Sequence, residues 1–173
     1  MAVLNNDQQL IYDTLTAILL GYSEYSQLKL YKDERLLSLG FALKKPLNAD
    51  YFIPRQNRII DSILAYNNLQ ATGKGTLRLL YDSIMVYIVR DIATLTNDEI
   101  KLLPQIMKEE FGDNLVDNFG TPQLIREDKR GEASYCLLYF KDVDIDSDYI
   151  AFEHGDSIKT TKTDFKALER AAS

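Results

Sequence analysis

The sequence predicts a mainly helical α+β protein: a bundle of five or six helices with a small antiparallel β element near the C-terminus and a closing helix. Apolar residues recur at helical spacing along most of residues 1–130. Prolines and glycines fall between these stretches, where helices begin or end. After Gly131 the pattern becomes strand-like, with turn residues between short apolar runs.

The composition fits one folded domain over residues 1–173, in which residues 131–173 form a β-hairpin and terminal helix packed on the helical body of residues 1–130. A chain of 173 residues is long enough to bury a core. Apolar residues make up 46% and charged residues 27%, which is close to globular averages. We therefore expect order over most of the chain.

Three helices are predicted in the first 70 residues. The first runs from about Asn6 to Leu20, where Asn5 or Asn6 caps it and Gly21 ends it. The second covers about residues 26–43, and Pro46 stops it because proline lacks the backbone donor. The third begins at Pro54, a favoured position for proline.

The most apolar stretch, about residues 76–95, is predicted to be the central helix of the bundle. One face is marked by Leu77, Leu80, Tyr81, Ile84, Ile88 and Leu95. Further apolar residues cover much of the remaining surface, and a helix that is apolar on most sides is usually buried. This prediction places Ile84 in the core, so an Ile84→Asp substitution is expected to unfold the protein.

The remaining helices are marked by their ends. Thr96 and Glu99 have the spacing of a capping box for the next helix, in which Glu99 reaches back to the cap. Pro104 lies inside that helix and predicts a kink or two short pieces. A short helix is expected at about 113–119, and the closing helix at 164–171.

The β element is predicted from three runs after Gly131. Residues 135–140 form the first strand, 149–152 the second and 157–161 the third. Gly155 and Asp156 are suited to a turn between the last two.

The charge of the chain is unevenly distributed. The net charge is −6, and residues 97–156 alone carry −9. An acidic chain argues against general nucleic-acid binding, which requires a basic face. The acidic block is either a solvated face or a surface for a basic partner.

The phosphate-loop motif is incomplete. Gly73, Lys74, Gly75 and Thr76 match its end, but Asn68 stands where the motif requires its first glycine. The preceding residues are also helical in pattern, whereas the motif follows a strand. We therefore expect an interhelix loop rather than a nucleotide site.

An Asp-rich segment has the carboxylate spacing of an EF-hand-type calcium loop. The acidic residues at loop positions one, three, five and twelve are Asp142, Asp144, Asp146 and Glu153. Ser147 replaces the glycine that allows the sharp turn, and the flanking pattern is strand. The favoured interpretation is a hairpin with Val143 and Ile145 inward, and we expect neither a bound metal nor a cofactor.

The chain contains one cysteine, Cys136, and one histidine, His154. No intrachain disulfide can form. One hypothesis is that these two residues form a catalytic pair on neighbouring strands. The aromatic-rich strand around Cys136 favours a structural thiol instead.

Two groups of residues are candidates for partner binding. The first combines aromatic and basic residues at the start of the third helix: Tyr51, Phe52, Arg55 and Arg58. The alternative is an ordinary solvated loop. The second is the acidic edge formed by Asp144, Asp146 and Asp148.

No complete catalytic motif is found, so a non-enzymatic role is favoured. The first hypothesis is a structural or adaptor subunit acting through protein–protein contacts in a larger assembly, such as a phage virion neck or connector. Its partners would be other protein subunits, in a homo-oligomer or hetero-assembly, without direct contact with nucleic acid or membrane. The alternative is an acidic phage or mobile-element inhibitor that occupies a nucleic-acid-binding surface of a host protein.

The location expected for the protein is the cytoplasm or a virion. The N-terminus lacks the basic region of a signal peptide, so secretion by that route is not expected.

Overall fold

The structure, a computed structural model, describes residues 4–69, 75–117, 122–154 and 157–172. Its centre is a six-stranded antiparallel sheet, and the predicted helical bundle is wrong. In spatial order the strands are β3 (Leu77–Asp82), β4 (Met85–Asp91), β2 (Leu36–Ala42), β1 (Gln27–Tyr31), β5 (Asp148–His154) and β6 (Ser157–Thr163).

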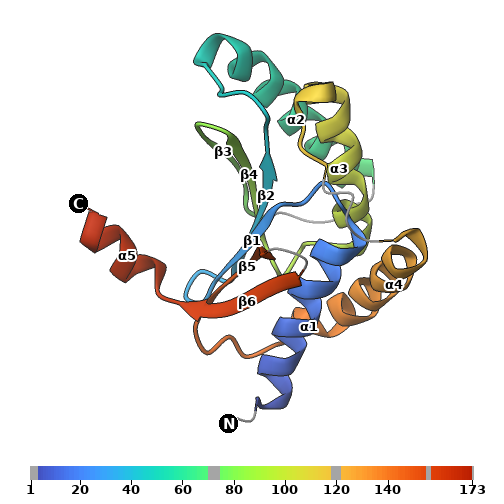
Figure 1. Cartoon of the computed structure of the whole chain (residues 1–173), viewed down its shortest axis with the longest axis vertical. Coiled ribbons are helices and arrows are strands. Elements are labelled where there is room, and N and C mark those ends of the chain that lie inside the picture. Colours follow the sequence, from blue (N-terminus) through green and yellow to red (C-terminus); the bar gives the residue numbers. More distant parts are fainter. Residues whose placement is uncertain (1–3, 70–74, 118–121, 155–156, 173) are drawn as a thin grey trace.

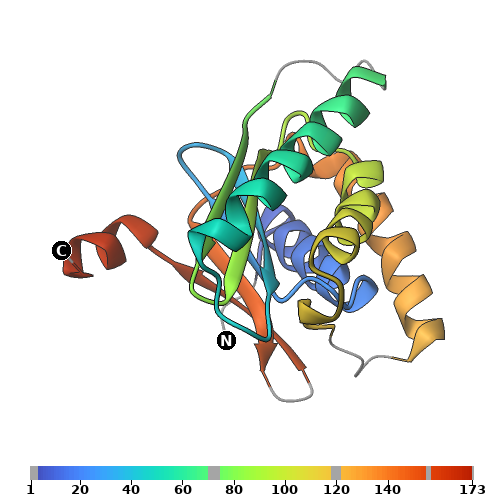
Figure 2. The same ribbon diagram turned by 90° about the horizontal axis from the view of Figure 1, so that it is seen from above.

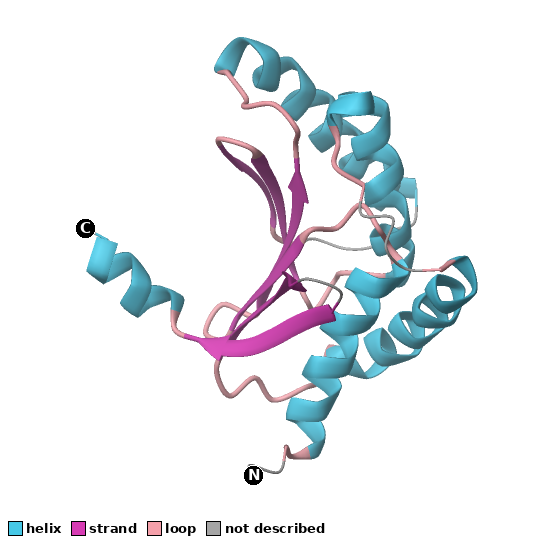
Figure 3. Ribbon diagram, viewed as in Figure 1, coloured by secondary structure: helices cyan, strands magenta, loops and turns pink. Residues whose placement is uncertain are grey.

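Four helices cover one face of this sheet and a fifth lies on the other side, as Figures 1 and 3 show. The covering helices are α1 (Asn6–Gly21), α2 (Ala49–Leu69), α3 (Asn97–Phe111) and α4 (Gln123–Phe140), with the short 3-10 helix η1 (Gly112–Asn114) after α3. The fifth is α5 (Phe165–Ala172), which projects away from the body (Figure 1).

The segment 26–43 is a hairpin, β1–β2, and the predicted second helix is wrong. Leu37, Leu39 and Phe41 are fully buried at every second position, which is the period of a strand. Ser38 and Gly40 between them face the opposite side of the sheet. The turn places Arg35 at a φ of 53°, and its guanidinium donates hydrogen bonds to the carbonyls of residues 141 and 143.

The segment 76–95 is also a hairpin, β3–β4, and not the central helix. Val86 and Ile88 are buried on the helix side, whereas Tyr87 lies on the opposite face. Val86 to Val89 are β-branched or aromatic, and such residues favour strands. The turn lies at Ser83, with a φ of 27°, and Ile84 beside it is 45% exposed.

The run 135–140 is helical, so the predicted strand there is wrong. It forms the second half of α4, where the buried residues are Ala133, Cys136, Leu137 and Phe140. Their spacing of three and four residues is that of one helix face. The sheet therefore does not begin after Gly131; α4 runs through that position, and β5 pairs with β1.

Several predicted elements agree with the structure. The first helix is α1, and Asn5 caps it through the amide of Gln8. The 149–152 and 157–161 runs lie in β5 and β6, which pair antiparallel. The predicted turn at Gly155 and Asp156 lies outside the described residues. The closing helix is α5. The third helix begins earlier than predicted, at Ala49, and Pro54 lies inside it.

The Thr96 cap is confirmed, but Glu99 has a different partner. The Thr96 hydroxyl accepts from the Glu99 amide at 3.2 Å. The Glu99 carboxylate is fully buried and accepts two hydrogen bonds, at 2.8 and 2.9 Å, from the guanidinium of Arg90 on β4. α3 then continues through Pro104 as one helix. The expected helix at 113–119 is wrong in its described part: only the 3-10 turn η1 is helical, Leu115 forms a β-bridge with Leu43, and residues 118–121 are not described.

Further hydrogen bonds surround the Arg90–Glu99 pair. Arg90 also donates to the Thr76 carbonyl at 2.6 Å, the Asp91 carboxylate at 2.8 Å and the Thr94 hydroxyl at 3.1 Å. The network joins the start of β3, the end of β4 and the first turn of α3. A buried charge is tolerated only when it is paired in this way.

We predict that Ile88→Asp unfolds the protein whereas Ile84→Asp does not. Ile88 is fully buried on β4, and an unpaired buried charge costs several kcal/mol against a typical stability of about 5–15 kcal/mol. Circular dichroism melting of both variants tests this. A cooperative melt of Ile88→Asp near the wild-type temperature would contradict the placement of β4.

A second prediction concerns Glu99→Gln, which leaves the Arg90 guanidinium buried without its main counter-charge. We expect a loss of about 3–5 kcal/mol in the free energy of unfolding, measured by urea denaturation. Glu110→Gln on the same helix is the control. Its partner Arg58 is 56% exposed, so that pair should contribute little to stability. Equal losses in the two variants would contradict the prediction.

Candidate functional site

The sheet face opposite the four covering helices is the main candidate surface. Because side chains alternate along a strand, this face carries Lys29 and Tyr31 of β1, Tyr87 and Val89 of β4, and Arg78 of β3. Figures 1 and 2 show α1 to α4 on the other side. The helix-free face is therefore bounded by β3 at one edge and by α5 near the other.

The middle of this face is a cation between aromatic rings. The Lys29 amino group lies 4.7 Å from the centre of the Tyr87 ring and 5.8 Å from that of Phe165. Partial burial lowers the pKa of Lys29, and nearby Asp82 opposes this effect. Gly40 makes room beneath Tyr87, because a Cβ there would lie 3.3 Å from that ring and 2.9 Å from the Gln27 carbonyl. The two rings and Lys29 thus form a packed surface in the middle of this sheet face, which is called the floor below.

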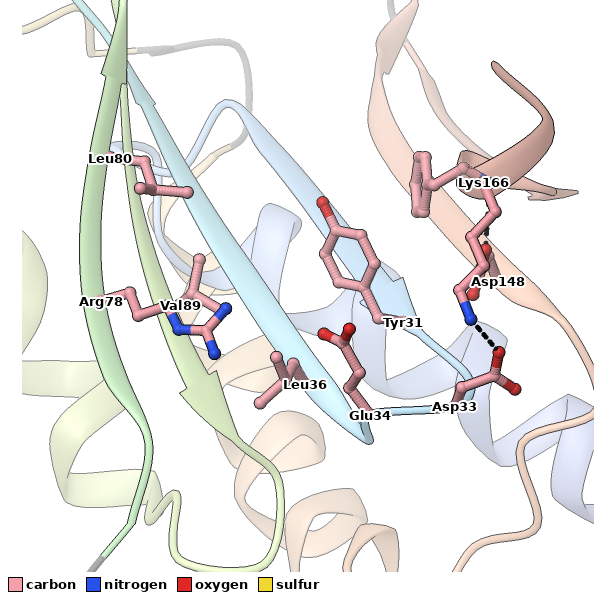
Figure 4. A pocket seen from close by; sticks show the side chains of 10 residues that line it. Tyr31, Asp33, Glu34, Leu36, Arg78, Leu80, Val89, Asp148 and Lys166 are labelled. Carbon is pink, nitrogen blue, oxygen red and sulfur yellow. Dashed lines mark hydrogen bonds and ion pairs between the residues drawn. The ribbon is translucent and has the colours of Figure 1, made fainter. Parts of the chain in front are cut away.

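A groove of ≈ 250 Å³ lies beside this floor. Figure 4 shows its two walls: Arg78, Leu80 and Val89 on one side, and Tyr31, Asp33 and Lys166 on the other. Leu36 and Glu34 lie between them, and Phe165 also lines it. The groove therefore combines an apolar base with charges of both signs.

The groove wall that includes α5 is held by its first turn. Asp148 accepts from the amides of Lys32 and Phe165, at 2.8 and 3.0 Å, and thereby joins β1, β5 and α5. The Phe165 ring lies 4.8 Å from that of Tyr31, and Lys166 pairs with Asp33 at 2.7 Å. Leu168, one turn further along, is 59% exposed.

The opposite wall offers unengaged side chains. Leu80 is 52% exposed. Arg78 on this wall and Glu34 between the two walls make no hydrogen bond or ion pair with the described part of the chain, although the charge of Glu34 helps to raise the pKa of Lys166 (Figure 4). A basic and an acidic group are thus available there to a molecule that enters.

The predicted aromatic and basic group at residues 51–58 lies at the contact of α2 with α3. Phe52 is fully buried and packs on Tyr81. The Arg55 guanidinium lies over the Tyr51 ring at 3.7 Å and donates to the Glu110 carbonyl. Arg58 pairs with the Glu110 carboxylate at 2.9 Å. These four residues are engaged within the chain, and a partner for them stays a prediction.

The predicted acidic group does not gather into one site. Asp142 and Asp144 are exposed in an irregular segment before β5, and Glu153 lies on β5. In the described ranges no cluster of three or more His, Cys, Asp or Glu residues is placed to hold a metal. Val143 and Ile145 are buried as expected, 3% and 4% exposed, but this segment is not a strand.

Asp146 is instead the acceptor of a side-chain network. Lys162 of β6, the Tyr149 hydroxyl and the Gln8 amide all donate to its carboxylate. Burial alone would raise the pKa of Asp146, but the hydrogen bonds from these three residues outweigh it and hold the pKa well below its usual value. Burial and the bond to Asp146 raise the pKa of Tyr149. The network joins α1 to the β5–β6 hairpin.

Cys136 and His154 lie in different layers. Cys136 is buried in α4, and burial is the main cause that raises the pKa of its thiol. His154 is exposed at the end of β5, on the same sheet face as Phe152, which is the face without covering helices. The structure therefore does not bring these two residues together.

Gly75, from the incomplete phosphate-loop motif, lies against the Arg90 network. A Cβ at this position would lie 2.2 Å from the Thr94 hydroxyl and 2.4 Å from the Asp91 carboxylate. The Thr76 amide donates to Asp91 at 2.7 Å. Gly75 is thus required by close packing at the start of β3, and residues 73 and 74 lie outside the described residues. The expected interhelix loop is wrong, because β3 follows it.

The groove residues were not found from sequence because they come from five strands, the β1–β2 turn and α5, and the first and last of them are more than a hundred positions apart. Comparison with protein-family models, with curated proteins and with solved structures gives no match. Within the ranges that the structure describes, each helix is too short or too polar to cross a bilayer.

We predict that Asp146→Asn lowers stability more at neutral pH than in acid. A carboxyl group whose folded pKa lies below the unfolded value of about 3.9 stabilises the fold fully above that value. The stabilisation is lost as the pH falls through the folded pKa. The difference in free energy of unfolding between wild type and Asp146→Asn should be constant above about pH 5 and shrink below about pH 4.

Urea denaturation at pH 7, 5 and 3 measures this difference. The control is Asp144→Asn, an exposed residue two positions away, for which little change is expected at any of the three pH values. A difference for Asp146→Asn that persists undiminished at pH 3 would contradict the role of the ionised carboxylate.

Proposed function

We propose that the protein is a non-enzymatic structural or adaptor subunit that acts through protein–protein contacts in a larger assembly. The observation that carries this proposal is the groove on the helix-free sheet face, between β3–β4 and α5. Apolar side chains at its base provide area, and unengaged charges at its sides provide specificity, which is the composition of many protein interfaces.

The groove chemistry favours one kind of partner. Leu36, Leu80 and Val89 suit an apolar anchor residue. Arg78 suits a carboxylate beside that anchor, and Glu34 suits a basic group on the other side. We therefore propose as partner a protein segment in which one apolar residue is flanked by an acidic and a basic residue. A phage neck or connector is one assembly in which such a subunit would serve.

The inhibitor alternative has less support. Several carboxylates of the acidic block are engaged within the chain: Glu99 with Arg90, Glu110 with Arg58, Asp146 with Lys162 and Asp148 with backbone amides. A phosphate-like surface requires free carboxylates on one face, whereas the exposed ones are spread over α3, α4 and the segment before β5, among them Asp98, Glu109, Glu127, Asp128, Asp142 and Asp144.

We predict that Leu80→Asp and Arg78→Glu abolish partner binding without unfolding the protein, because both side chains are exposed in the groove. Tagged wild-type and variant proteins would be purified from the native source, and the bound proteins quantified by mass spectrometry. Ile84→Asp is the matched control, since Ile84 is a similarly exposed apolar residue of the same hairpin that does not line the groove. Equal recovery with all variants would contradict the groove, and recovery of no partner would contradict the adaptor function.

A further inference from the structure

The outer face of α4 presents an apolar stripe to solvent. Leu124 is 78% exposed, Tyr135 63% and Leu138 71%. Figure 2 shows α4 at the outer side of the helical layer, so this face points away from the sheet. The inner face packs on α1 through other residues, including Ala133 and Cys136. An exposed apolar stripe on a helix is typical of a protein interface.

Gly131 lies in the middle of this stripe, and no contact with the described part of the chain requires a glycine there. A Cβ at Gly131 would meet no atom within 4 Å, although glycine inside a helix costs about 1 kcal/mol relative to alanine. Gly21 shows the contrast, because a Cβ there would lie 3.0–3.3 Å from Arg130 of α4. The close packing of α1 on α4 explains the glycine at position 21. At position 131 the absence of a side chain instead leaves room for another molecule to approach the helix closely.

The stripe is symmetric about Gly131. Leu124 precedes it by seven residues and Leu138 follows it by seven, which is two helical turns, or about 10 Å, in each direction. If a second α4 lies antiparallel with a two-fold axis beside Gly131, each Leu124 meets the Leu138 of the other copy. The two glycines then face one another. Such a self-complementary patch is what a two-fold interface requires.

Charge also favours the antiparallel arrangement. The first half of this face carries the exposed Glu127 and Asp128, and the second half carries the hydroxyl of the half-buried Ser134 and that of Tyr135, which is hydrogen-bonded to Tyr139. Antiparallel packing brings carboxylates of one copy beside hydroxyls of the other, where hydrogen bonds form. Parallel packing would place carboxylates of one copy against the same carboxylates of the other, which is unfavourable because like charges repel.

We propose that α4 is a homodimer interface, in which two copies of this chain pack antiparallel across Gly131. The surface is distinct from the groove, and the inference deepens the proposed function by naming a second copy as one partner. Stable interfaces use roughly 20–30 residues on each side. One helix face offers fewer, so the dimer is weak and depends on protein concentration.

Gly131→Arg tests the proposal because it should weaken dimerisation without lowering the melting temperature. Arginine favours a helix more than glycine does, and the site is open, so the melting temperature should stay equal or rise. Dimerisation should weaken at least tenfold, measured by sedimentation velocity over a concentration series. Ala65→Arg on α2 is the matched control: it places the same charge at an exposed helical position and should dimerise like wild type.

Cysteine cross-linking tests the direction of packing. Leu124→Cys and Leu138→Cys proteins are mixed and oxidised, and the 124–138 disulfide between copies is expected to form faster than either homodisulfide. Wild type is the control, since its single Cys136 is buried. Faster 124–124 and 138–138 products would overturn the antiparallel arrangement. A wild-type monomer at every concentration would overturn the dimer, and it would leave the groove proposal to its own test.

Discussion

The buried ion pair between Arg90 and Glu99 is the interaction on which the architecture most depends. It joins the last residues of β4 to the first turn of α3, and so fixes where α3 begins relative to the sheet. The residues around the pair hold it in place. Asp91 and Thr94 accept hydrogen bonds from the guanidinium and orient it, and Gly75 leaves the space that they occupy. Removal of either charge leaves the other in a dry interior, which is more costly than the loss of an exposed pair such as Arg58–Glu110.

The one-sided covering of the sheet explains where the exposed chemistry lies. Four helices bury the face that carries Leu37, Leu39 and Phe41, so the opposite face must be closed by its own side chains. Lys29 between the Tyr87 and Phe165 rings closes its middle, and the groove remains where β3–β4 diverges from α5. An antiparallel sheet tolerates one solvated face. The same face is therefore available for a partner without any rearrangement of the core.

Local signals predicted some elements of the fold, and long-range pairing decided the others. The Asn5 and Thr96 caps and the β5–β6 hairpin depend on neighbouring residues, and they were predicted correctly. The hairpins at 27–42 and 77–91 contain nearly continuous apolar runs, and β2 is buried on both faces. Such runs do not separate strand from helix. Ser83 and Arg35 adopt positive φ values without the usual glycine, so neither turn was marked. The groove joins Tyr31, Arg78 and Phe165, and only the folded topology brings them together.

The position of β1 has a consequence for how the chain acquires its structure during synthesis. β1 is made early, beside β2, yet its other neighbour is β5, whose residues follow more than a hundred positions later. Until residues 148–154 leave the ribosome, the amides and carbonyls on that side of β1 have no strand to pair with. Such distant pairing is slow to form. A nascent chain that pauses before β5 thus exposes an open sheet edge, and the last hairpin both completes the sheet and protects the earlier strands from aggregation.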